Sequence, residues 1–286
     1  LTPKTISNIF EEILEKYNNQ EKNIRKITGS YYTPLEVAEY IFKETLKEYI
    51  KEKVKNLTEE EIKSLLSEKE IEIEEDKRIK IFEAIKDIKI IDPACGTGNF
   101  IIVAIKILVN LLKKIDKNNN LLLKYFDKKD IFDNTKYTSD YVRKIYLIEN
   151  CIYGVDKQKL AVIVTEYRLL FYLLKDVKKP FFVPKFKSNL FIQDTLIEFN
   201  LENYFDIVIG NPPYVRQEKI GDIKDKLKKY EVYVSTADLY VYFYEKGIKL
   251  LKNKGFLGYI TSNKWLSSKH AEKLRNYLKD FKITKI

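Results

Sequence analysis

Sulfur-containing residues and histidine are scarce in this sequence. Methionine is absent, histidine occurs once and cysteine twice among 286 residues. Two cysteines exclude a disulfide-rich scaffold and favour a reducing, intracellular compartment. Because the chain starts at Leu1 and contains no methionine, we expect it to be a piece of a longer protein.

Long apolar runs are also missing. The most hydrophobic helix-like run, residues 100–112, is interrupted by Lys106 and Asn110 and is too short to span a bilayer. No secretory signal peptide is visible. The sequence therefore predicts a cytoplasmic protein without a membrane segment.

The residues that are present suffice for a sizeable core. Hydrophobic residues make up 45% and charged residues 33% of the chain, which is typical of a folded globular protein. The net charge of +10 favours a polyanionic partner such as nucleic acid. A lysine-rich genome bias would produce the same charge, so composition leaves this choice open.

The N-terminal part of the sequence is typical of helices. Helices are expected over residues 1–27 and 35–54, with Thr33 as N-cap and Pro34 as first residue of the second helix. The highly charged stretch 56–87 is interpreted as a solvated helical insertion.

From residue 88 onward, short apolar strands alternate with helices. The expected strands cover residues 88–92, 152–156, 190–193, 206–209 and 256–261. The expected helices cover residues 99–115, 141–149, 157–174, 239–251 and 269–279. This alternation predicts an α/β fold with a Rossmann-like, doubly wound parallel sheet covered on both faces. In such sheets ligands bind beyond the carboxyl ends of the strands.

The first expected strand ends in the motif DPACGTGNF, residues 92–100. Here Gly96 and Gly98 allow a tight turn and the close approach of a ligand before an apolar helix. A dinucleotide-binding turn would need a third glycine where Ile101 stands, and a phosphate-binding loop would need a Gly-Lys-Ser/Thr sequence. The motif therefore predicts a small cofactor without a pyrophosphate.

Two acidic residues stand at the tips of the next two expected strands. Asp156 can accept hydrogen bonds from the ribose hydroxyls of a nucleoside, or it can cap the following helix. Asp194 can accept from an adenine amino group, or it too can be a cap or turn residue. The glycine turn before them favours the ligand-binding reading for Asp156 and leaves both readings open for Asp194.

The fourth expected strand ends in Asn-Pro-Pro-Tyr, residues 211–214. The prolines carry no N–H for a sheet ladder, so the chain leaves the sheet in a stiff geometry. A rigid loop would explain the prolines but not Asn211, and Tyr214 taken alone would be a core aromatic.

Together these motifs resemble those of the S-adenosylmethionine-dependent N6-adenine DNA methyltransferases, most closely the methyltransferase part of type IIG restriction–modification enzymes. The resemblance includes an early motif, GSYYTP at residues 29–34, and the sequence ADLYVYFYEKG after residue 236. It implies a cofactor site formed by Tyr32, Thr33, Pro34, Asp92, Pro93, Ala94, Cys95, Gly96, Gly98, Asn99, Phe100, Asp156, Asp194 and Phe243. It divides the chain into an N-terminal helical region, 1–87, and a C-terminally truncated catalytic domain, 88–286.

The resemblance also implies a mechanism. The side-chain oxygen of Asn211 and the carbonyl of Pro212 accept the two N–H groups of a flipped-out adenine, and Tyr214 stacks on that base. No metal is required, and Cys95 is interpreted as a small packed residue rather than a nucleophile. Arg216 and Lys219 are possible phosphate contacts.

Several expectations concern the rest of the protein. Double-stranded DNA is the expected partner, with a target-recognition domain C-terminal to this chain and any endonuclease outside it. Residues 281–286, FKITKI, read as the start of another strand. The alternatives are a methyltransferase acting on a protein glutamine or an RNA base, and a cofactor-bound domain kept for DNA binding or assembly. The sequence does not indicate an oligomeric state.

Overall fold

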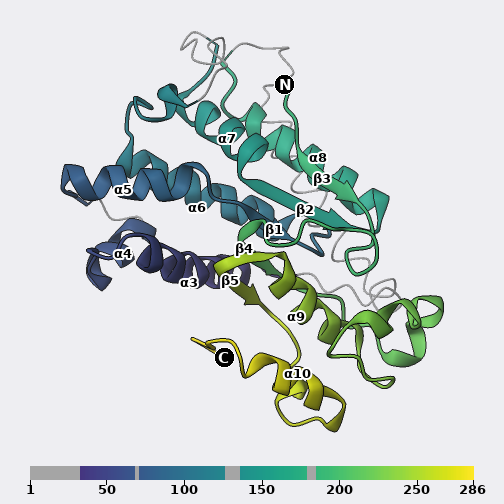
Figure 1. The fold of residues 1–286 in the computed structure, drawn as a ribbon. Coiled ribbons are helices and arrows are strands. Elements are labelled where there is room, and N and C mark those ends of the chain that lie inside the picture. Colours follow the sequence, from purple (N-terminus) through teal and green to yellow (C-terminus); the bar gives the residue numbers. More distant parts are fainter. Residues whose placement is uncertain (1–32, 68–70, 126–135, 179–184) are drawn as a thin grey trace.

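The computed structural model describes residues 33–67, 71–125, 136–178 and 185–286 (Figure 1). The helix expected over residues 1–27 lies outside the described residues. The helices are α3 (Leu35–Lys53), α4 (Glu59–Leu66), α5 (Glu75–Lys86), α6 (Asn99–Ile115), α7 (Ser139–Asn150), α8 (Lys159–Leu174), α9 (Leu239–Leu250) and α10 (Glu272–Leu278). The strands are β1 (Ile90–Asp92), β2 (Ile152–Asp156), β3 (Asn189–Ile192), β4 (Phe205–Gly210) and β5 (Leu251–Tyr259).

The strands form one parallel sheet in the order β3-β2-β1-β4-β5. Ile90 of β1 pairs with Ile152 on one side and with Ile207 on the other. The chain moves outward from β1 to β3 and then returns to the other side of β1 with β4. The switch point therefore lies between β1 and β4, where doubly wound sheets bind their ligands.

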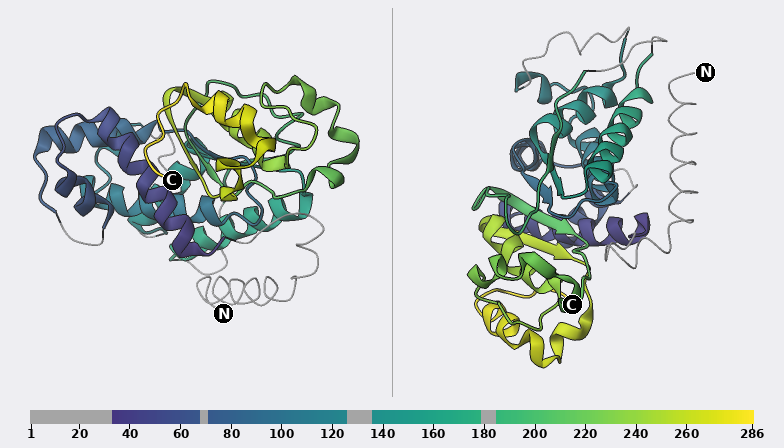
Figure 2. Two further views of the ribbon diagram at one scale, coloured as in Figure 1. Left: turned by 90° about the horizontal axis from the view of Figure 1, so that it is seen from below. Right: turned by 90° about the vertical axis from the view of Figure 1, so that its right-hand side faces the viewer.

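Apolar side chains cover both faces of the sheet. On one face, Ile90, Ile152 and Ile207 pack in a cluster with α3, α6, α7 and α8. On the other face, strand residues such as Val208 pack with Phe199 and with Leu250 at the end of α9. Figures 1 and 2 show α9, in yellow-green, beside the sheet. Burial on both faces explains why the central strands β1 and β4 are almost continuously apolar.

Helices α4 and α5 only partly match the expected solvated insertion. Their outer faces carry exposed ion pairs such as Lys80–Asp76. Their inner faces are fully buried, with Ile62 of α4 and Phe82 of α5 in the same cluster as α6. The prediction of a solvated segment was therefore wrong for the inner faces, because the apolar residues recur at helical spacing among the charges.

Four further local predictions need correction. Pro34 rather than Thr33 is the N-cap of α3, and no side chain caps that helix. Strand β5 begins at Leu251, five residues before the expected start. Helix α10 begins at Glu272, after a short 3-10 turn over Lys269–Ala271. Residues 281–286 pair with no strand within the described chain.

None of the helices in the described ranges is both long and apolar enough to cross a membrane. The longest, α3, carries charged residues along its length and packs with the sheet rather than standing apart (Figure 1).

Candidate active site

The turn after β1 has a backbone that favours glycine. Gly96 has φ +52° and Gly98 has φ +83°, in the left-handed region that side chains rarely adopt. A Cβ on Gly98 would lie 2.6 Å from Cγ2 of Thr165 in α8, whereas a Cβ on Gly96 would meet nothing within 4 Å. The turn is thus packed tightly on its α8 side and open beside Gly96, directly before the N-terminus of α6.

Asp92 lies beneath this turn and is almost completely buried. Its Oδ1 accepts a hydrogen bond from the N–H of Ala94 at 3.0 Å. A Cβ on Gly210 would come within 2.6 Å of the same oxygen, so the ends of β1 and β4 touch at this point. Burial raises the pKa of Asp92 to about 8, against a smaller lowering by the hydrogen bond from Ala94.

Asp156 joins the end of β2 to the glycine turn. Its Oδ2 accepts from the N–H of Gly96 at 2.9 Å, and its Oδ1 accepts from the N–H of Gln158 at 2.8 Å. Burial raises the pKa of Asp156, while these two hydrogen bonds lower it. The carboxylate therefore orders both the turn and the start of α8, and it stands where a nucleoside cofactor would meet the sheet.

The segment after β3 packs on the same turn. Asp194 accepts the N–H of Leu196 at Oδ1, as expected of a turn residue, and the Thr195 hydroxyl donates to the carbonyl of Pro93. Leu196 shares an apolar cluster with Phe243 of α9, and Ala94 packs against that cluster. The structure thus brings the residues expected around a cofactor adenine to one side of the turn.

Helix α8 holds the turn from the other side, which the sequence analysis missed. The Thr165 hydroxyl donates to the carbonyl of Gly96 at 2.9 Å. The Arg168 guanidinium donates to Oδ1 of Asn99 at 2.7 Å and to the carbonyl of Thr97. A usable signal was present: a threonine and an arginine three residues apart lie on one face of a mostly apolar helix.

The Asn-Pro-Pro-Tyr loop leaves β4 beside this turn. Asn211 donates from Nδ2 to the hydroxyl of Thr33 at 3.0 Å, a contact between residues 178 positions apart. Tyr214 donates from its hydroxyl to the carbonyl of Ile260 at 3.1 Å, and its ring lies 5.9 Å from the ring of Tyr240. The loop is therefore tied both to the segment before α3 and to the segment after β5.

The remaining predicted residues fall into three groups. Cys95 and Phe100 are buried in the core, and burial raises the pKa of the Cys95 thiol, which favours its neutral form. Arg216 and Lys219 are exposed after the loop. Tyr32 lies outside the described residues.

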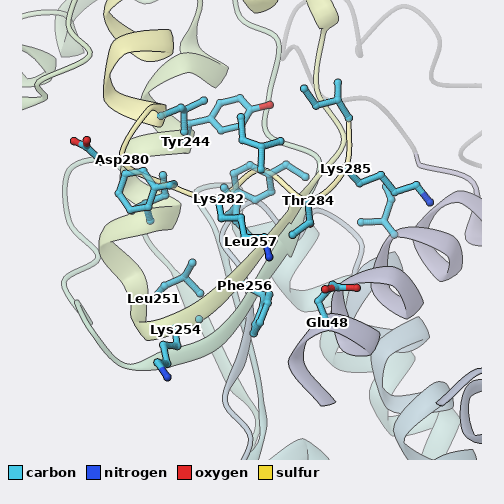
Figure 3. Close-up of a pocket in the computed structure, with 18 of the residues that line it drawn as sticks. Glu48, Tyr244, Leu251, Lys254, Phe256, Leu257, Asp280, Lys282, Thr284 and Lys285 are labelled. Atoms are coloured by element: carbon cyan, nitrogen blue, oxygen red, sulfur yellow. The ribbon is translucent and has the colours of Figure 1, made fainter. Parts of the chain in front are cut away.

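A metal centre and a surface groove would be alternative sites. Among the described residues, no group of three or more histidine, cysteine, aspartate or glutamate side chains could hold a metal ion. A groove of about 1370 Å³ runs along β5, between this strand, α3 and the C-terminal segment (Figure 3). None of the predicted site residues lines this groove. The candidate active site is therefore the junction of the strand ends.

Comparison with known sequences agrees with the motifs. Residues 150–286 match the family model of the Eco57I restriction-modification methylase. The type II restriction enzyme and methyltransferase RM.Eco57I of Escherichia coli is 29% identical over 227 residues, covering 68% of this chain and 22% of that protein. The type II methyltransferase M.BstVI of Geobacillus stearothermophilus is 28% identical over 207 residues, covering 68% of this chain and 32% of that protein. The predicted resemblance is confirmed, and the chain spans about a fifth to a third of the length of these relatives.

Comparison with solved structures concerns the fold. One similar structure is that of the type IIL restriction-modification enzyme MmeI in complex with DNA. The match covers 98% of this chain and 36% of the MmeI chain, with a TM-score of 0.59 and 15% identity. The type IIG restriction endonuclease BpuSI matches 97% of this chain with 24% of its own at a TM-score of 0.51 and 14% identity. The predicted Rossmann-like α/β class is confirmed.

Proposed function

We propose that this chain supplies the cofactor-binding and methyl-transferring part of an N6-adenine DNA methyltransferase in a restriction–modification system. One observation carries the proposal: β1 and β4, which lead into the glycine turn and into Asn211, are neighbours at the switch point of the sheet, and Gly210 lies against Asp92 there. Type II methyltransferases among the relatives support DNA as the substrate.

The residues around the glycine turn fit S-adenosylmethionine. The open space beside Gly96 and the carboxylate of Asp156 suit the sugar of a nucleoside, and we assign Asp194 and Phe243 to its base. The absence of a phosphate-binding sequence agrees with a cofactor that has no pyrophosphate. When bound, this cofactor supplies a methyl group on a cationic sulfur.

The catalytic task of the chain is to prepare a weak nucleophile. The lone pair of the adenine amino nitrogen is delocalised into the ring, so the nitrogen must become pyramidal before it attacks. We assign Oδ1 of Asn211 and the carbonyl of Pro212 as acceptors for its two N–H groups, which favours the pyramidal form. The amino group gains the methyl and loses one proton. The adjoining prolines fix φ and hold both acceptors in place.

The target base must leave the duplex to reach this site. Tyr214 is assigned as the residue that stacks on the flipped base, and its hydroxyl bond to Ile260 holds the ring in one orientation. Exposed Arg216 and Lys219 follow directly in the chain and are placed to contact phosphates. Because the chain spans a minor part of its relatives, sequence recognition is assigned to other parts of the full protein.

The test uses the full-length protein, tritium-labelled cofactor and duplex DNA. The wild type is expected to label adenine at N6, and Asn211→Ala is expected to lower the rate roughly 100- to 1000-fold, as for loss of one oriented acceptor or donor at a reacting group. Asn253→Ala, an exposed asparagine on β5, is the matched control and should retain wild-type activity.

The same assay separates the alternatives. Label in RNA or in a protein glutamine, but not in DNA, would replace the DNA proposal with the second candidate. Cofactor binding without transfer to any of these substrates would favour a role in DNA binding or assembly. Wild-type rates for Asn211→Ala would overturn the mechanism.

A further inference from the structure

A chain of side-chain hydrogen bonds runs from α8 to Asn211. Arg168 donates to Oδ1 of Asn99 at 2.7 Å, and Nδ2 of Asn99 donates to the backbone carbonyl of Thr33 at 2.8 Å. The Thr33 hydroxyl then accepts from Nδ2 of Asn211 at 3.0 Å. These four residues come from α8, α6, the segment before α3 and the loop after β4.

In the first two of these hydrogen bonds, from Arg168 to Asn99 and from Asn99 to Thr33, the donor and the acceptor cannot be exchanged. Arginine can only donate hydrogen bonds and a backbone carbonyl can only accept them. Asn99 must therefore turn Oδ1 toward Arg168 and Nδ2 toward Thr33. Arg168, Asn99 and Thr33 are all at least 93% buried, so water does not compete freely for these bonds. The position of Thr33 is thus set by Asn99.

The last hydrogen bond of the series, from Asn211 to the Thr33 hydroxyl, positions the side-chain amide of Asn211. A primary amide is planar, so turning Nδ2 toward Thr33 turns Oδ1 to the opposite side. The carbonyl oxygen is the atom that an amino-group substrate requires, because Nδ2 can only donate. If the amide were rotated by half a turn, the N–H groups of Nδ2 would face the N–H groups of the substrate, and no hydrogen bond could form between them.

We propose that Thr33 is a positioning residue that fixes the place of the Asn211 amide: its hydroxyl binds Nδ2 and leaves Oδ1 on the opposite side, and Asn99 and Arg168 hold Thr33. The inference rests on the proposed role of Asn211 as acceptor for the target amino group. It gives Thr33 and Asn99 a task in the transfer step in addition to any contact with the cofactor. Because Arg168 also binds the Thr97 carbonyl, one buried guanidinium supports both the glycine turn and the catalytic amide.

The decisive variant is Thr33→Val, which keeps the side-chain shape and removes the hydroxyl. The kcat of the full-length enzyme on duplex DNA should fall roughly tenfold to a hundredfold, as for other misplaced reacting groups. The loss of kcat should exceed any change in the dissociation constant for the cofactor, which is measured by calorimetry without DNA. Thr33→Ser restores the hydroxyl and should recover most of kcat.

A double-mutant cycle tests whether Thr33 acts through Asn211. In an Asn211→Ala background, Thr33→Val should cause little further loss, because the amide that it orients is gone. Thr45→Val is the matched control: Thr45 is a buried threonine of α3 whose hydroxyl bonds within its own helix, to Ile41. It should leave kcat near the wild-type value.

If Thr33→Val fails to fold, Asn99→Asp provides a second route. It still accepts from Arg168 but cannot donate to the Thr33 carbonyl, so kcat should again fall. The inference is overturned if Thr33→Val weakens cofactor binding while kcat is retained. It is also overturned if Thr33→Val lowers kcat by the same factor in the Asn211→Ala background as in the wild type. A wild type that transfers no methyl group to DNA would instead overturn the proposed function, and the assigned task of Thr33 with it.

Discussion

The two strand ends that build the site achieve rigidity in different ways. The turn after β1 contains two glycines, which are flexible residues, and is held by its surroundings: Asp156 binds Gly96, and Thr165 and Arg168 bind the turn carbonyls. The loop after β4 contains two prolines, whose rings restrict the backbone before any contact forms.

The difference follows from what each segment must do. A turn whose backbone lies close to a ligand needs residues without side chains. Because glycine is flexible, the conformation of such a turn has to be fixed by contacts with neighbouring elements. A loop that presents a carbonyl and an amide can use proline, because neither acceptor requires a backbone N–H. The proposed cofactor half of the site should therefore be sensitive to changes in α8, and the proposed catalytic half should depend more on its own sequence.

The largest expected effect would disrupt the glycine turn. Gly98→Ala combines a strained backbone with a clash against Thr165, and should lower the free energy of unfolding by about 3 kcal/mol. Gly96→Ala has the strain without the clash and should cost about 1 kcal/mol. Urea denaturation of both variants measures the difference.

A second substitution identifies the cause. Adding Thr165→Ser removes the Cγ2 that a Cβ on residue 98 would meet, and should recover part of the stability lost in Gly98→Ala. Equal losses for the two glycine variants would show that the packing of α8 does not hold the turn.

Asp92, which lies where the ends of β1 and β4 touch, should make the stability of the protein depend on pH. Because burial raises the pKa of Asp92 from an ordinary 3.8 to about 8, the folded protein binds this proton more tightly than the unfolded chain. The stabilisation is complete below about pH 4 and is lost as the pH rises through about 8. Asp92→Asn should therefore flatten the decline in unfolding free energy across this range.

The control for this experiment is Asp87→Asn, an aspartate that is mostly exposed at the end of α5. Because this variant keeps Asp92, its unfolding free energy should still decline between pH 4 and 8. A wild-type slope for Asp92→Asn would mean that this carboxyl titrates normally in the folded protein.

The smallest expected effect concerns the proline-restricted loop. Tyr214→Phe removes only the hydroxyl bond to Ile260 and should cost about 1 kcal/mol of stability, with methyl transfer reduced only a few-fold because the ring remains. Thermal unfolding and the tritium assay measure the two effects. Tyr125→Phe, which removes an exposed bond to Glu83, is the matched control and should affect neither. A loss of activity as large as that of Asn211→Ala would contradict the assignment of the ring as the working part of Tyr214.

The sheet was predictable because each strand is a short apolar run closed by a turn motif. The exception is β5, whose first residues, Leu251–Gly255, read as a helix end followed by a turn. In the structure Leu251 pairs with Phe205 and Phe256 pairs with Ile207, so residues 252–255 form an irregularity in the ladder, where Lys254 has φ +62°. The pairing of Leu251 with a neighbouring strand extends β5 to the far side of this irregularity, which a local pattern does not reveal.

The motifs were enough to propose the residues of the candidate site, but not to predict the contacts between them. The motifs name Thr33, Asn99 and Asn211 separately, and nothing in one sequence shows that they share a hydrogen-bond chain. Arg168 was missed because it lies within an apolar helix, outside every motif. Side-chain contacts across a fold depend on the packing of the elements, which local patterns do not encode.

The long span of the Thr33–Asn211 contact has a consequence for folding. The two residues are 178 positions apart, and the Asn99–Thr33 contact spans 66. Contacts between residues so far apart in the sequence form only after long loops have closed. Closing a long loop costs conformational entropy, so these contacts form slowly. During refolding, helical circular dichroism should therefore return before enzymatic activity, and the active site should be among the last parts of the molecule to assemble.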